Sequence, residues 1–410
     1  MRVAFVRTPR NRNSIAVLMR VLVPLGNGGR LEVAAYDAPP CDLSSADILA
    51  FSFTTVDLDE AVSRIAPFAR APHRPLLIAG GPHPSADPEG TLRLGFDAVF
   101  TGEAERTLPA FVASWAADPD VRRVVREPVI AAFGQPFDLD SAPHADGTTS
   151  EFPFVEISRG CPHSCAFCQV PATFGRKVRF RGPATILAGV AHAVARGHRR
   201  IRFLASDAFS YGGGPPEAVA AALDGLLGSC RAAGALFPML GSFPAEVRPD
   251  RVRAELLAVV ARHCANRTVV VGAQSGSDAA LTLMLRGHCV EDNRRAVRLV
   301  AEAGLVPHVD LLFGFPGETR EDRLASLDLA REVLGLPESR LHLHAYLPLP
   351  GAPAWPALPE PIEPEVVATL RALKDTGRVD GYWDQQVAQG RRVAELLRSG
   401  LISAKPWRQL

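Results

Sequence analysis

Short apolar runs that alternate with helical patterns fill most of this chain, and they restrict it to parallel α/β architectures. One such series occupies roughly the first 115 residues, and a second begins at Phe154. Residues from about 117 to 150 contain Pro, Gly, Asp and Ser without clear periodicity, which is typical of a connector. The expected strands are Val3–Val6, Glu32–Tyr36, Ile48–Phe53, Leu76–Ala79 and Ala98–Thr101, followed by Phe154–Ser158, Ile201–Ala205, Phe237–Gly241, Thr268–Gly272, Val306–Phe313 and Leu341–Leu347. The expected helices include Leu58–Phe68, Pro183–Ala195, Pro216–Cys230, Arg251–His263 and Glu321–Leu334.

These patterns divide the 410 residues into four parts. Residues 1–125 are expected to form a Rossmann-like or flavodoxin-like domain, whose ligand site lies at the carboxyl ends of its strands. Residues 126–150 are expected to form a linker. Residues 151–350 are expected to form a partial (β/α)6 barrel of the TIM-like kind, with its chemistry at the carboxyl ends of the strands. The Pro-rich and then helical residues 351–410 are expected to form a small C-terminal cap.

A loop with three cysteines follows the first strand of the second series. Cys161, Cys165 and Cys168 have the spacing Cys-x3-Cys-x2-Cys, which offers three thiolates to a 4Fe–4S cluster and leaves one iron without a protein ligand. A structural zinc site usually pairs two knuckles, whereas this chain has one triplet, and His163 is crowded inside the same loop. A disulfide is disfavoured because nothing in the chain suggests secretion. We therefore expect a cluster with one open coordination position.

The cysteine loop resembles the signature of the radical SAM superfamily. This resemblance implies that the open iron chelates S-adenosylmethionine, whose reductive cleavage gives a 5′-deoxyadenosyl radical. Further motifs at successive strand ends extend the resemblance over about residues 152 to 350, although each motif alone could be a turn or a helix cap. The resemblance implies contacts with S-adenosylmethionine from Phe167, Asp207, Ser242, Glu246, Gln274, Ser275, Arg286 and Gly314.

The strand ends of the first series resemble the cobalamin-binding domain that is fused to one branch of the radical SAM enzymes. Many cobalamin domains place a cobalt-ligating histidine after their first strand, but here that loop reads Thr8 to Ser14 and the first histidine of the chain is His73. The alternative is an α/β scaffold that has lost its ligand. The resemblance implies cobalamin contacts from Ser52, Thr54, Thr55, Gly80, Gly81, His83, Gly102 and Glu103, with His83 near the corrin but not a cobalt ligand.

Composition narrows the expected partners and location. A net charge of +1 argues against a general nucleic-acid binder. We find no signal peptide and no run of about 18 uncharged apolar residues, so no membrane span is expected. Seven cysteines, an odd number, suit a reducing cytoplasm. The expected partners are a small-molecule substrate and an electron donor such as flavodoxin or ferredoxin.

The resemblance implies a cobalamin-dependent radical SAM enzyme, with methylation of an unactivated carbon as the first interpretation. A radical cyclase, isomerase or oxidoreductase with the same two domains is the main alternative. The Gln274–Ser277 motif with Arg286 also resembles methylthiotransferases, so a methylthiotransferase-like enzyme is a further alternative. Two features stay open: His342 and His344 share one face of the last strand, and a basic stretch from Arg176 to Arg181 is either a solvated face or a contact to an acidic group.

Overall fold

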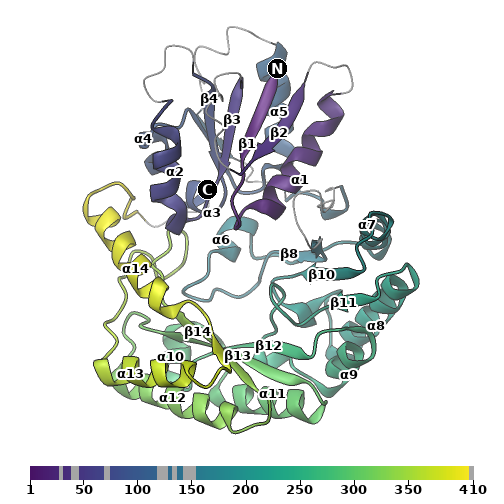
Figure 1. The fold of residues 1–410 in the computed structure, drawn as a ribbon, viewed down its shortest axis with the longest axis vertical. Helices are drawn as coiled ribbons and strands as arrows, with labels where there is room; N and C mark the ends of the chain where they lie inside the picture. Colours follow the sequence, from purple (N-terminus) through teal and green to yellow (C-terminus); the bar gives the residue numbers. More distant parts are fainter. Residues whose placement is uncertain are drawn as a thin grey trace.

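The chain folds into two parallel α/β units that are joined by their C-terminal segment (Figure 1). The structure is a computed structural model, and it describes residues 1–26, 31–37, 46–68, 74–117, 128–131, 136–141 and 154–405. In Figure 1 the first sheet lies above the second unit, and the yellow helix α14 runs between them on the left. No helix among the described residues is long and apolar enough to cross a membrane.

The first unit is a six-stranded parallel sheet in the order β2-β1-β3-β4-β5-β6. Alternate residues of the strands face opposite sides: Val3 and Phe5 pack with α1 and α5, whereas Ala4 and Val6 pack on the side of α2. The strands are β1 (Arg2–Val6), β2 (Glu32–Tyr36), β3 (Ile48–Ser52), β4 (Leu76–Gly80), β5 (Ala98–Thr101) and β6 (Val129–Ala131). The helices are α1 (Arg12–Leu22), α2 (Leu58–Ile65), α3 (Pro82–Ala86), α4 (Pro88–Arg93) and α5 (Ala104–Ala117).

The second unit is a partial barrel of parallel strands. One sheet has the order β11-β10-β7, the other has the order β12-β13-β14-β15, and a parallel bridge between Val247 and Val271 connects them. The six predicted strands are present, which confirms the predicted α/β fold class. The strands are β7 (Phe154–Glu156), β10 (Arg200–Leu204), β11 (Phe237–Met239), β12 (Thr268–Gln274), β13 (Val306–Phe313), β14 (Arg340–Ala345) and β15 (Val379–Asp380), and the short hairpin β8 (Ser158–Arg159) and β9 (Arg179–Phe180) lies after β7.

Helices cover the outside of this barrel (Figure 1). The helix predicted from Arg251 begins only at Ala254, because Arg253 is extended and Arg251 belongs to a 3-10 turn. The helices are α6 (Val170–Phe174), α7 (Pro183–Ala195), α8 (Pro216–Ala232), α9 (Ala254–His263), α10 (Asp278–Leu283), α11 (Val290–Glu302), α12 (Arg320–Leu334), α13 (Pro364–Lys374) and α14 (Trp383–Arg398).

The C-terminal segment connects the two units. Helix α14 packs beside β14, and its far end places Val393, Leu396 and the following Ile402 in the core of the first unit. Arg392 binds the carboxylate of Asp59 through two hydrogen bonds of 2.8 and 2.9 Å. The expected cap is therefore a strap that completes the apolar face of the first sheet.

Candidate active site

The cysteine loop lies at the carboxyl end of the first barrel strand, as predicted, and distant segments hold its backbone. The amide of Cys161 donates to the carbonyl of Gly175 at 3.2 Å. The amide of Ala166 donates to the carbonyl of Met284 at 2.9 Å, and its carbonyl accepts from the amide of Ala354 at 2.8 Å. These bonds connect the loop to the end of α10 and to the C-terminal segment. The conformation of the cysteine loop therefore depends on segments that are distant from it in the sequence.

The thiols of the cysteine loop lie in a desolvated place. Burial raises the pKa of Cys161 and raises the pKa of Cys168 to about 11. Thiolates become favourable there when a metal binds, because ligated thiols are deprotonated.

Arg286 is the cation of this site. Its Nη1 lies 3.2 Å from the sulfur of Cys165, and its Nη2 donates to the carbonyl of Gly272 at 2.5 Å. Its guanidinium lies 5.8 Å from the ring centre of Phe167, and its own carbonyl accepts from Arg248 at 2.7 Å. A positive charge at a cysteine stabilises the thiolate form. Arg286, predicted to contact S-adenosylmethionine, therefore lies directly beside the predicted cluster.

Three of the predicted polar contacts gather at neighbouring strand ends. Burial raises the pKa of Asp207 to about 6, and its side chain accepts from the amide of Phe209 at 3.2 Å. The hydroxyl of Ser242 is buried without a hydrogen-bond partner among the described residues. Glu246 lies at the border of two cavities and is hydrogen-bonded to Asp310, whose pKa burial raises far above its usual value. The hydrogen-bonding capacity of these groups is not fully satisfied within the protein.

The hydroxyl of Ser275 has partners within the fold, and its contact with S-adenosylmethionine stays a prediction. Its side chain is fully buried, with its hydroxyl 3.0 Å from that of Ser326 and accepting from the amide of Ser277 at 3.1 Å. A hydroxyl with these partners is satisfied within the fold. Ser275 therefore fixes the turn after β12, and Ser277 caps α10.

Gly314 packs closely against the C-terminal segment, and its contact with S-adenosylmethionine stays a prediction. It has a φ of +75°, and a Cβ there would lie 3.0 Å from the carbonyl oxygen of Glu360. The amide of Glu360 donates to the carbonyl of Gly314 at 3.0 Å. Gln274 is buried with a φ of +71° at a bulge in β12, and its contact with S-adenosylmethionine stays a prediction.

A cavity of about 540 Å³ lies between the two units and joins the two predicted cofactor regions. Its size is within the range of cofactor sites. The first unit lines it with the ends of β3, β4 and β5, and the barrel lines it from the cysteine loop and the ends of β7 and β10. The lining residues include Ser52, Gly80, Gly81, Gly102 and Glu103 from the first unit and Glu156, Arg159, Cys168, Ser206 and Glu246 from the second.

Three residues predicted to contact cobalamin lie behind the cavity wall instead. Thr54 donates its hydroxyl hydrogen bond to Asp57 at 2.6 Å. The hydroxyl of Thr55 lies 3.1 Å from Nδ1 of His83, whose buried ring stacks on Phe53 at 5.7 Å. Burial lowers the pKa of His83 to about 4, so the ring is neutral near pH 7. These contacts let the three side chains support the loops, and their direct contact with cobalamin stays a prediction.

A network of buried ion pairs lies at the interface between the two units. Its central residues were not predicted as a network from the sequence. Glu103 forms ion pairs with Arg159 at 3.0 Å and with Arg179 at 2.6 Å. Arg159 also forms ion pairs with Glu105 at 2.7 Å and with Glu156 at 2.8 Å. The basic stretch that contains Arg179 suggested a solvated face or a contact to an acidic substrate group. Arg179 has neither role, because it pairs with Glu103. The only sequence signal was charge inside apolar strand patterns: Arg159 directly precedes the cysteine loop, and Glu103 directly follows β5.

Replacing Gly160 by alanine is expected to prevent assembly of the cysteine loop. Gly160 has a φ of +88°, and an added Cβ would collide with the carbonyl oxygen of Lys177. Gly197 at the end of α7 is a matched control, because its φ of +90° is also positive while it is exposed and nothing lies within 4 Å of its Cβ. We expect Gly160→Ala to retain little iron after anaerobic reconstitution and Gly197→Ala to retain most of it. Equal iron contents would contradict this role of Gly160.

Comparison with protein families assigns both units. Residues 155–330 match the family model of the radical SAM superfamily, and residues 42–112 match that of the B12 binding domain. The chain therefore carries a radical SAM domain with a B12-binding domain ahead of it. It is an enzyme whose cofactors are a 4Fe–4S cluster, S-adenosylmethionine and cobalamin.

Solved structures with the same architecture share its fold. One is the radical S-adenosylmethionine methyltransferase TsrM from Kitasatospora setae with tryptophan substrate and a S-adenosylmethionine analogue, with a TM-score of 0.63, 19% identity, and coverage of 86% of this chain and 74% of that one. Another is the cobalamin-dependent S-adenosylmethionine radical enzyme OxsB, with a TM-score of 0.61, 14% identity, and coverage of 98% and 62%.

Curated relatives are more similar in sequence but longer. A tRNA-2-methylthio-N(6)-dimethylallyladenosine synthase from Mycobacterium leprae is 32% identical over 325 residues, which is 74% of this chain and 60% of the relative. The synthase of the same name from Desulfosudis oleivorans is 32% identical over 280 residues, which is 66% of this chain and 57% of the relative. The chain therefore spans about three fifths of the length of these synthases.

Proposed function

We propose that this enzyme uses cobalamin and radical SAM chemistry to methylate an unactivated carbon of a small molecule. The observation that carries the proposal is the cavity of about 540 Å³, because Cys168 of the cluster loop and the predicted cobalamin loops line it together. When bound, the cluster and S-adenosylmethionine supply the hydrogen-abstracting radical, and cobalamin supplies the methyl group. A substrate in this cavity would face both groups without leaving the protein.

In this proposal the chain's own residues hold the cluster, orient the cofactor regions and exclude water. Cys161, Cys165 and Cys168 hold the cluster, and the Arg286 guanidinium offsets the thiolate charge beside Cys165. Burial and the neighbouring Glu246 carboxyl raise the pKa of Asp310 well above its usual value, which favours the protonated form of Asp310 beside Glu246. The buried network around Glu103 keeps the two cofactor regions together and limits the entry of water. Flavodoxin or ferredoxin is the proposed electron donor.

Cobalamin retention tests the position of the B12 site. Gly80 lines the interdomain cavity, and a leucine there would project into it, whereas Gly225 on α8 has nothing within 4 Å of its Cβ. After anaerobic reconstitution with iron, sulfide and hydroxocobalamin, we expect the wild type and Gly225→Leu to retain the visible cobalamin spectrum through gel filtration. We expect Gly80→Leu to lose it by about tenfold or more, since the cradle is filled. A wild-type protein that retains no cobalamin would overturn the methyltransferase proposal.

The reaction type is tested separately, with S-adenosylmethionine carrying a deuterated methyl group. With a substrate present, methyl transfer yields 5′-deoxyadenosine, S-adenosylhomocysteine and a labelled product. Formation of 5′-deoxyadenosine without S-adenosylhomocysteine would instead assign a cyclase, isomerase or oxidoreductase.

Methylthiolation is the second candidate, because the curated relatives named above are tRNA methylthio synthases. Incubation with unmodified tRNA and mass analysis of its nucleosides separates the two. We expect no methylthio nucleoside, because residues 42–112 match a B12 binding domain. A methylthio product would reverse the assignment.

A further inference from the structure

Three metal-ligating side chains converge at the barrel wall, away from the cysteine loop. His308 lies on β13, His342 on β14 and Asp380 on β15, and one ligand atom from each lies within 4.8 Å of the others. Nε2 of His308 is 3.2 Å from Oδ1 of Asp380, and Nδ1 of His342 is 2.6 Å from the same oxygen. Ligands around one four- to six-coordinate ion are spaced by about 3 Å. The three groups therefore have nearly the spacing that one ion requires.

The strand register fixes this convergence. His342 is paired in register with Asp380 on β15, and β13 lies on the other side of β14. Residues in register on neighbouring strands project to the same face, so the backbone holds the ligands together. Leu341 and Leu343 face the outer helices, which confirms that the histidines of β14 share the opposite face.

The charge at this place favours a cation. Asp380 is the acidic group of this cluster, and its Oδ1 is the oxygen that the imidazole nitrogens of both His308 and His342 contact. Its other oxygen, Oδ2, faces Arg340 at 3.7 Å, which leaves Oδ1 for the histidine side. Asp380 thus offers one directed anionic oxygen between two imidazole nitrogens.

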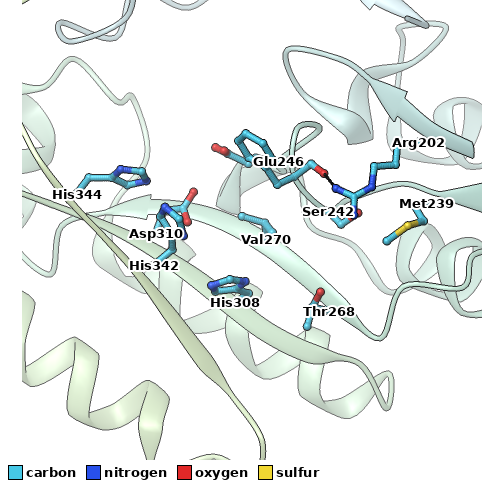
Figure 2. A pocket seen from close by; sticks show the side chains of 11 residues that line it. Arg202, Met239, Ser242, Glu246, Thr268, Val270, His308, Asp310, His342 and His344 are labelled. Carbon is cyan, nitrogen blue, oxygen red and sulfur yellow. Dashed lines mark hydrogen bonds between the residues drawn. The ribbon is translucent and has the colours of Figure 1, made fainter. Parts of the chain in front are cut away.

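Two of the three groups, His308 and His342, border a cavity of about 220 Å³ inside the barrel. Figure 2 shows His308, His342 and His344 along one wall of this cavity, with Asp310 beside them and Glu246 above. The side chains of His308, His342 and Asp380 are 15%, 24% and 43% exposed, so an ion can reach them without passing the cluster. A bound ion would have open positions toward the cavity.

We propose that His308, His342 and Asp380 bind one divalent transition-metal ion of the zinc or iron(II) class, independently of the cysteine cluster. Two imidazoles and one carboxylate suit these ions and disfavour magnesium and calcium, which prefer oxygen ligands. Three protein ligands leave a position for an oxygen or nitrogen donor of a molecule in the cavity. The ion would thereby give the cavity a recognition point for a polar substrate group.

Cobalt(II) is the probe that tests this site in the full-length protein, which is reconstituted with iron and sulfide but without cobalamin, because cobalamin would add cobalt of its own to the count. The oxidised 4Fe–4S cluster is diamagnetic, so high-spin cobalt(II) can be observed by low-temperature EPR, and elemental analysis counts cobalt and iron per chain. We expect about one cobalt per chain after gel filtration. Asp380→Asn and His342→Gln are expected to weaken binding by about tenfold or more with unchanged iron content.

His192→Gln is the matched control, because His192 is exposed on α7, and it should bind cobalt as the wild type does. His308→Gln provides a second ligand variant if one of the others melts early by circular dichroism. A wild type that binds no cobalt, or ligand variants that bind it as tightly as the control, would overturn the proposal. The three residues would then form only an ion-pair cluster. The measurement needs no turnover, so its failure leaves the proposed methyl transfer untouched.

Discussion

Replacing Cys165 by serine is expected to abolish cleavage of S-adenosylmethionine. Cys165 is the most buried of the three loop cysteines, and its sulfur is the one that Arg286 contacts. A serine hydroxyl has nearly the same size but does not supply the soft thiolate that the cluster needs. We expect 5′-deoxyadenosine formation with dithionite to fall by roughly three orders of magnitude, to the level without enzyme.

Cys289→Ser is the matched control for this result. Cys289 is exposed at the start of α11, where serine can also cap the helix, so this variant should keep full iron content and cleavage. The melting temperature of Cys165→Ser without cluster should match that of the wild type without cluster. A Cys165→Ser protein that still forms 5′-deoxyadenosine would contradict the cluster assignment.

Replacing Glu103 by glutamine is expected to destabilise the protein by about 3 kcal/mol, because Arg159 and Arg179 then keep their buried charges with one carboxylate fewer. The measurement is chemical denaturation, followed by a probe in each unit. Glu89→Gln is the control: Glu89 pairs with Lys405 at 3.7 Å on the surface, where an ion pair contributes about 1 kcal/mol or less.

The effect of Glu103→Gln should depend on pH in a defined direction. Burial alone would raise the pKa of Glu103, but its hydrogen bonds to Arg179 and Arg159 lower it below the usual range. The carboxylate therefore contributes its full stabilisation above about pH 4.3, the ordinary value for glutamate, and loses it as the pH falls through its lower value in the folded state. The stability difference from the wild type should stay constant down to that pH and shrink below it. A constant difference at all pH values would show that charge is not its cause.

The sequence predicted the strands that form a core by their own pattern and missed those that depend on neighbours. Strand β13 was predicted with its observed bounds because Val306–Phe313 is long and apolar. Strands β6 and β15 have three and two residues and exist through pairing with β5 and β14. Such short strands carry no periodicity of their own.

The site shows a similar division. Cysteine spacing is local chemistry, so Cys161, Cys165 and Cys168 could be assigned from the chain alone. The direction of a side chain at a strand end is not local, and for that reason the sequence did not show that Ser275 and His83 have hydrogen-bond partners inside the fold. Arg159 was missed because its partner Glu103 lies 56 residues earlier in the chain.

The strap formed by the C-terminal segment bears on how the protein is made. The first unit is synthesised before the barrel, yet Trp355, Val393, Leu396 and Ile402, which follow most of the barrel in the sequence, belong to its core. Until they are made, one face of its sheet lacks part of its apolar cover, which is a condition that favours aggregation. The first unit can therefore complete its core only after the barrel strands have been synthesised.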